Sequence, residues 1–214
     1  MASEQVKIAS QNYNLSAQAA ERAVSQAAEQ QNWKKAEFLA NQVRDFFSDQ
    51  TVEKVVYVLD WDLRKIRLTD DPNEVVVLAL HDEGGLALVK NETALCNEYL
   101  KKNRVVIIAR SLREHDGRPF TELEMLVRDN FDWLFFRLGE FQHMIQAGLF
   151  SYAEVDVHLS YVLDLISGGK SHVSAQMVAA IERYLVAYDF PATNELRASR
   201  VKFRKAVSAT DGSG

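Results

Sequence analysis

The chain has 214 residues, of which 47% are hydrophobic and 26% are charged, and its formal net charge is −5. This balance is typical of a folded domain and argues against a general coat for nucleic acid. Cys96 is the single cysteine, which excludes an intramolecular disulfide and a metal cage of cysteines. The longest apolar run, residues 75–80, is far shorter than the ~18 residues of a membrane span, and residues 1–10 lack a signal pattern. We therefore expect a cytoplasmic protein with no transmembrane segment.

The N-terminal part of the chain is predicted to be a polar helical arm with a loose start. Residues 1–14 are polar and show no periodicity, so we expect no regular structure there. Residues 16–31 are rich in Ala, Gln, Ser and Glu, which favours a helix that can bury little area by itself. Such an arm is expected to pack on a protein partner or on a second copy of the chain.

Two helices are predicted to follow the arm and to lead into a less regular middle. The first helix begins at Trp33, and either Ser48 or Asp49 can cap the second helix, over 51–59. A small β-hairpin is indicated within 64–90 by alternating and β-branched residues around a Gly-Gly turn. Buried helical turns are the alternative for this hairpin. Residues 93–101 are expected to be helical, and residues 105–109 can be strand or helix, with helix favoured.

The segment 120–166 contains two helix starts with the same construction. Each has a Thr or Ser cap, a Glu three residues later and apolar residues at the staple positions. The two caps and their glutamates are Thr121 with Glu124 and Ser151 with Glu154. Gly148 stands where the first helix is expected to stop in a left-handed conformation. The segment predicts an αα-hairpin, about 122–147 and 152–166, at the centre of a mainly α helical bundle.

The C-terminal part is predicted to contain one more core helix and then a basic helix. Ser171 or Ser174 can cap the core helix, which should stop before Pro191. The basic helix carries five cations within nine residues: Arg197, Arg200, Lys202, Arg204 and Lys205. Nucleic acid or an anionic membrane surface could use this basic patch, but the acidic net charge favours a solvated helix whose cations offset acidic neighbours.

Taken together, these patterns divide the chain into three parts. We expect a polar, Ala/Gln-rich helical arm at 1–31 and a single mainly helical domain at 32–190. A basic helix and a frayed tail should occupy 191–214.

The two helices of the hairpin carry candidate metal ligands. Glu140 and His143 have the Glu-x-x-His spacing that places a carboxylate and an imidazole on one helical face, as in di-metal bundles. Glu154 and His158 on the next helix could face this pair, although the capping box already explains Glu154. A bundle site needs a second copy of the motif, which the chain lacks. We therefore predict no metal, no other cofactor and no catalytic residue.

Large aromatic residues crowd the first helix of the hairpin. Trp133, Phe135 and Phe136 make it apolar around much of its circumference, and such a helix is either central in its fold or covered by a partner. The core is the favoured location. If a partner covers them, these three residues and Trp33 are the candidate interaction residues.

Arg128 and Asp129 open the motif Arg-Asp-x-Phe-Asp-x-x-Phe at residues 128–135. A surface ladder at i,i+4 spacing accounts for the two charges, while burial at the hairpin, where they would hold neighbouring elements in register, is the alternative. The motif resembles one in uncharacterised, mainly helical bacterial proteins, over about residues 35–166. The resemblance implies one bacterial helical domain and transfers no functional residue.

The function that these observations predict is a non-enzymatic protein-interaction or regulatory module. Its partner would be an unidentified protein or a second copy of the chain. Metal binding through Glu140 and His143 is one alternative, and binding of nucleic acid or an anionic surface through the basic patch is another.

Overall fold

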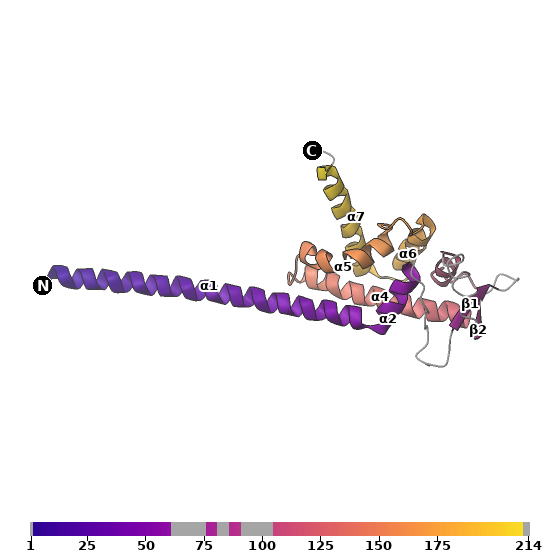
Figure 1. Ribbon diagram of the computed structural model, residues 1–214, viewed down its shortest axis with the longest axis horizontal. Coiled ribbons are helices and arrows are strands. Elements are labelled where there is room, and N and C mark those ends of the chain that lie inside the picture. The colour runs from indigo at the N-terminus through magenta and orange to yellow at the C-terminus, as the bar shows by residue number, and fades with distance from the viewer. Residues whose placement is uncertain (1, 61–75, 81–85, 91–104, 212–214) are drawn as a thin grey trace. The chain divides into compact units, whose positions relative to one another are not determined.

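The computed structural model describes residues 2–60, 76–80, 86–90 and 105–211. The chain forms two compact units, Met1–Gln42 and Val43–Gly214. Helices dominate the described residues of both units (Figure 1), which confirms the predicted mainly α fold class. The first unit ends later than the predicted arm, and the second unit includes the C-terminal basic helix.

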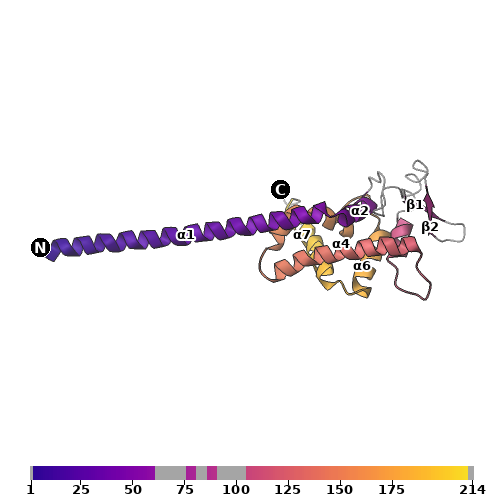
Figure 2. The ribbon, with the colours of Figure 1, turned by 90° about the horizontal axis from the view of Figure 1, so that it is seen from below.

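Helix α1 is continuous from Ala2 to Ser48 (Figure 2). It includes residues 2–14, so the prediction of a loose start was wrong, and it passes through Trp33 without a boundary. The physical reason lies in the composition: residues 2–48 contain neither Gly nor Pro and are rich in Ala, so no residue in this segment breaks the helix. The first unit consists of this helix as far as Gln42.

A single residue, Asp49, separates the end of α1 from helix α2, Gln50–Leu59. Of the two predicted caps, Asp49 is the one used. Its Oδ1 accepts hydrogen bonds from the backbone amides of Thr51, at 2.8 Å, and Val52, at 3.3 Å. These bonds satisfy two of the amides that lack a partner at a helix start. The carboxylate therefore fixes the point at which the chain turns from α1 into α2.

The two predicted capping boxes are both present. Helix α4, Glu122–Gln146, starts at Thr121, and helix α5, Tyr152–Ser167, starts at Ser151. In each box the cap hydroxyl accepts from the Glu amide, while the Glu carboxylate accepts from the cap amide. Gly148, with φ +72°, follows α4 in the left-handed conformation that was expected. The boundaries predicted for these two helices are thus confirmed.

Helix α6, Ala175–Ala187, is capped by Ser174, the second of the two predicted caps. Helix α7, Pro191–Asp211, starts with its proline in the first turn, where a missing backbone N–H does no harm. We expected α7 to lie outside the helical domain, but it packs against α4, α5 and α6 and is central to the second unit. Both α4 and α5 pack more extensively on α7 than on each other.

The middle of the chain is described in part. Strands β1, Val76–Leu80, and β2, Leu86–Lys90, pair antiparallel, with Val76 opposite Lys90 and Leu80 opposite Leu86. These strands fall within the range 64–90 where a hairpin was indicated. Residues 105–111 are helical, although the sequence left strand and helix open there. Cys96 and the rest of the indicated range lie outside the described residues.

Aromatic rings form much of the core of the second unit. Phe135 lies among Phe131, Tyr184 and Phe190, with ring centroids 5.7, 6.1 and 5.5 Å away. The hydroxyl of Thr193 on α7 donates to the carbonyl of Phe135 on α4. The rings and this hydrogen bond tie α4, α6 and α7 together around one fully buried side chain.

Two glycines in the same conformation allow a controlled test of this packing. Gly148 and Gly168 both have φ +72°, but a Cβ on Gly168 would lie 3.0 Å from Cγ2 of Val178, whereas one on Gly148 would meet open space. We expect Gly148→Ala to lower the free energy of unfolding by about 1–2 kcal/mol, the penalty for a left-handed residue with a side chain. Gly168→Ala should lower it further. Urea unfolding measures both, and equal losses would contradict this account.

Candidate functional site

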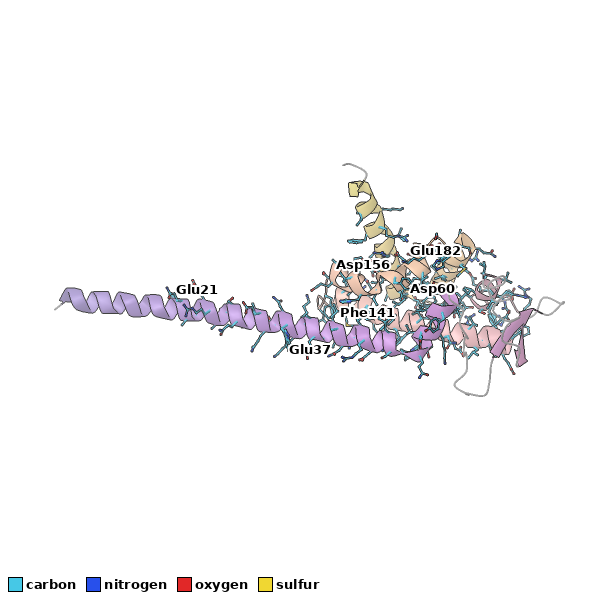
Figure 3. The ribbon with its side chains drawn as sticks, viewed as in Figure 1. Glu21, Glu37, Asp60, Phe141, Asp156 and Glu182 are labelled. Atoms are coloured by element: carbon cyan, nitrogen blue, oxygen red, sulfur yellow. The ribbon has the colours of Figure 1, made fainter. Side chains whose placement is uncertain are left out.

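A network of buried charges joins α5 to α7. The guanidinium of Arg200 donates to both carboxylate oxygens of Asp164, at 2.8 and 2.9 Å, and to Oδ2 of Asp156 at 2.7 Å. The hydroxyl of Tyr152 donates to the other oxygen of Asp156 at 2.7 Å. Asp156, labelled in Figure 3, and Asp164 are both more than nine-tenths buried. Because buried carboxylates need partners, Arg200 is the group that makes their burial tolerable.

The electrostatics of this network favour the ionised carboxylate. Burial alone would raise the pKa of Asp164, but the hydrogen bonds and charge of Arg200, with the charge of Arg204, together hold it below its ordinary value. The hydrogen bond from Arg200 to Asp164 likewise raises the pKa of the guanidinium. Gly169 leaves the space that the network occupies, because a Cβ there would overlap Asp164 and Arg204. The network therefore serves to join two helices.

The predicted basic patch is largely neutralised by these contacts. Arg204 Nη1 lies 3.3 Å from Oδ1 of Asp164, and Arg197 Nη1 lies 2.7 Å from Oε1 of Glu182. Arg200 is held as described above, while Lys202 and Lys205 are exposed. Three of the five predicted cations thus face carboxylates of the same chain. The helix presents less positive charge than its sequence implies.

Arg128 lies among aromatic rings. Its guanidinium carbon is 3.9 Å from the ring centroid of Tyr188 and 4.8 Å from those of Phe120 and Tyr184. It also donates to the carbonyl of Arg113 at 3.3 Å. These contacts connect α4 to α6 and to the segment before α4. Arg128 therefore holds neighbouring elements in register, which was the alternative to a place in a surface ladder. Its neighbour Asp129 is exposed and takes the surface role.

Asp132, in the same motif, accepts a 2.6 Å hydrogen bond from the hydroxyl of Tyr184. Burial raises the pKa of Asp132, although this bond and the charge of Arg128 oppose the rise. Burial and the same bond raise the pKa of Tyr184, so the phenol remains a donor. The motif at 128–135 thus packs α4 against α6 through Arg128, Asp132 and Phe135.

The four metal candidates do not form a site. Glu140 pairs with Arg137 at 3.2 Å, His143 lies 3.4 Å from Oε1 of Gln146, and Glu154 is held in its capping box. His158 is exposed on α5. Among the described residues, no three His, Cys, Asp or Glu side chains are grouped so that they could hold a metal ion. The packing of α7 against both α4 and α5 explains why the pairs on these two helices do not converge.

The aromatic candidates separate into core and surface. Phe135 is fully buried, so its assignment as an interaction residue was wrong: α6 and α7 cover the face of α4 that carries it. Trp133 and Phe136 are 42% and 54% exposed and stack on each other at 5.6 Å. The indole N–H of Trp133 donates to Oδ2 of Asp49 at 2.6 Å, which fixes the ring. Trp33, on α1, is 65% exposed.

Asp60 is the centre of a cluster that the sequence did not indicate. It accepts from the hydroxyl of Tyr161, and its Oδ1 lies 3.2 Å from Nε2 of His172. Burial and the bond to Asp60 raise the pKa of Tyr161 to about 12, so the phenol remains a donor at neutral pH. The cluster joins the end of α2 to α5 and to the α5–α6 connection. No local spacing relates these residues, since about a hundred positions separate Asp60 from its partners.

A shallow hollow lies between α2 and α4, lined by Lys54, Val55, Val58, Val127, Asn130 and Phe131. It is too narrow to admit a water molecule. Nδ2 of Asn130 has no hydrogen-bond partner there. The hollow is a packing defect and offers no room for a small-molecule ligand.

A further candidate surface is on α1. Every residue from 17 to 34 is exposed, including Val24 at 71% and Trp33 at 65%. Figure 3 shows the labelled side chain of Glu21 standing out from the helix. This exposed part of α1, residues 17–34, is called the arm surface below. It matches the Ala/Gln-rich segment that was predicted to meet a partner.

Comparison of the chain with protein-family models, with curated proteins and with solved structures found no match. The resemblance of residues 128–135 to a helical bacterial family therefore stays a prediction. Within the described residues, no helix combines the length and the apolar character needed to cross a membrane.

Proposed function

We propose that the protein is a non-enzymatic protein-interaction module whose docking segment is the arm surface. The observation that carries this proposal is a continuous helix in which residues 17–34 are all exposed. Helices in proteins gain most of their stability by packing an apolar face against other elements. Within the part of the chain that the structure describes, every residue of the arm surface is exposed, so a partner is the natural source of that stability.

The charges of α1 support the same conclusion. A solitary helix can be maintained by many opposite charges at i,i+4 spacing, each pair contributing a few tenths of a kcal/mol. The sequence of α1 contains no such pair, and residues 8–20 carry no charge at all. Helix propensity is the remaining source of stability, and Ser and Asn, which occupy four of the thirteen positions from 8 to 20, reduce it.

The composition of the arm surface also suits a helical partner. Alanine occupies six of the eighteen positions from 17 to 34, and small side chains let two helix axes approach to about 8 Å. Val24 and Trp33 add larger apolar side chains on this otherwise polar helix. We infer that the partner presents a helix, and that it covers Val24.

Val24→Glu tests this function. The full chain is purified from its source cells beside this variant and beside Ala19→Glu, which adds the same carboxylate about 140° around the helix. We expect a stoichiometric partner, either another protein or untagged copies of the chain, to co-elute with the wild type and with Ala19→Glu. Its yield should fall at least tenfold with Val24→Glu and vanish when residues 1–31 are deleted.

Thermal unfolding of the second unit serves as the folding control, and it should be the same in all four proteins. If the truncated chain retained the wild-type partner, the arm surface would not be the docking segment. A wild-type chain that recovers no partner and does not associate with itself would overturn the proposed function.

A further inference from the structure

We propose that the arm surface pairs antiparallel with the same surface of a second copy of this chain. The inference rests on the proposed function, since it names the partner of that segment. It is carried by one helix face whose members are spaced by three and four residues and are all exposed: Ala17, Ala20, Val24, Ala27, Gln31, Lys34 and Phe38. Such spacing places the seven side chains along one seam, as in a two-stranded coiled coil.

The order of side-chain sizes along the seam favours the antiparallel orientation. Small residues occupy its first half, and the larger Gln31, Lys34 and Phe38 occupy its second half. In a parallel pair in register, Lys34 would face Lys34 of the second copy, and two Phe38 rings would compete for one place. In an antiparallel pair, Phe38 lies over Ala20, so a large side chain meets a small one at every layer.

Charge complementarity points to the same register. Glu21 and Lys35 flank the seam on the same side, two heptads apart. When Phe38 lies opposite Ala20 of the other copy, Glu21 lies beside Lys35 of that copy, and the two-fold symmetry forms this ion pair twice. On the opposite side of the seam from Glu21 and Lys35, Gln30 lies beside Gln30 of the second copy. Of the other charges in this stretch, Arg22 and Glu29 point away from the seam. Glu37 lies beside Ala23 of the other copy, and Lys34 lies in the seam opposite Val24, so neither faces a like charge.

The size of the contact predicts how tight the pairing is. Residues 17–38 form a helical strip about 33 Å long at 1.5 Å per residue and roughly 10 Å wide. Two such strips bury on the order of 700 Å² in total, which is below the range of permanent complexes. The dimer should therefore be reversible and dependent on concentration.

Charge reversal tests both the partner and the register. Sedimentation equilibrium of the full chain should show a monomer–dimer equilibrium, and Glu21→Lys should weaken it about tenfold, because it replaces two attractive pairs with two repulsive ones. Lys35→Glu should do the same, and the double variant E21K/K35E should restore the wild-type dissociation constant. Glu29→Lys makes the same charge change away from the seam and should alter that constant less than twofold.

A distance measurement tests the orientation. With Cys96→Ser as background, a spin label at Gln18→Cys should lie about 33 Å from its equivalent in the antiparallel dimer, against roughly 10 Å in a parallel one. A chain that remains monomeric at millimolar concentration, a dimer indifferent to both charge reversals, or a short label distance would each overturn the proposal. A monomeric chain that still loses another protein with Val24→Glu would leave the proposed function standing.

Discussion

Replacing Arg200 with alanine is expected to lower the free energy of unfolding by about 3–5 kcal/mol. The substitution leaves Asp156 and Asp164 buried between α5 and α7 without the guanidinium that contacts both of them. Removing one partner of a buried ion pair destabilises a protein by far more than the intact pair stabilises it, because an unpaired charge is left in the interior. Lys202→Ala, two residues along the same helix and exposed, should change stability by no more than about 0.5 kcal/mol.

The pH dependence distinguishes a loss of charge pairing from a loss of packing. In the wild type the pKa of Asp164 is lowered, so its stabilisation is complete above the ordinary value of 3.8 and is lost as the pH falls through the folded-state pKa. Without Arg200, the effect of burial on the pKa of Asp164 is no longer offset by that guanidinium, so the folded protein should bind a proton at this carboxyl more readily. The deficit of Arg200→Ala should therefore shrink as the pH is lowered from 7 towards 4. Urea unfolding at several pH values measures this, and a constant deficit would point to packing instead.

Phe135→Ala is expected to have a comparable effect on stability, about 3–5 kcal/mol. The ring is fully buried and contacts three other aromatic rings, so its removal leaves a cavity where α4, α6 and α7 meet. Phe136→Ala provides a matched control, because the neighbouring ring is 54% exposed on the same helix. That variant should unfold within about 1 kcal/mol of the wild type. Chemical denaturation compares the two, and similar losses would show that the assignment of core and surface on α4 is mistaken.

The parts of this fold that could be predicted from sequence are those determined by near neighbours. The capping boxes at Thr121 and Ser151 each involve residues three positions apart, and Gly148 ends its helix by its own conformational freedom. Asp49 and Ser174 are caps of the same local kind. Such signals act within one turn of helix, so a single sequence contains all the information they need.

The features that escaped prediction depend on residues far apart in the chain. Whether Phe135 or Phe136 is buried depends on where α6 and α7 pack against α4, and the spacing of apolar residues within α4 does not show this. The sequence around Arg200 predicts a solvated cation, because its partner Asp164 lies 36 positions away in the chain. The loose start predicted for residues 1–14 is wrong for another reason. Polar residues without periodicity indicate that a helix has no buried face, and they do not exclude the helix itself.

The two oxygens of Asp49 perform separate tasks, and this restricts what can replace it. One oxygen caps α2 and the other accepts from the indole of Trp133. Serine or threonine could cap the helix but would not reach the indole with a second acceptor. Asparagine has one acceptor and would present an N–H to the indole N–H, a clash of two donors. Among the residues that serve as helix caps, aspartate alone meets both demands, so the tolerance of this position to substitution is far narrower than that of an ordinary cap.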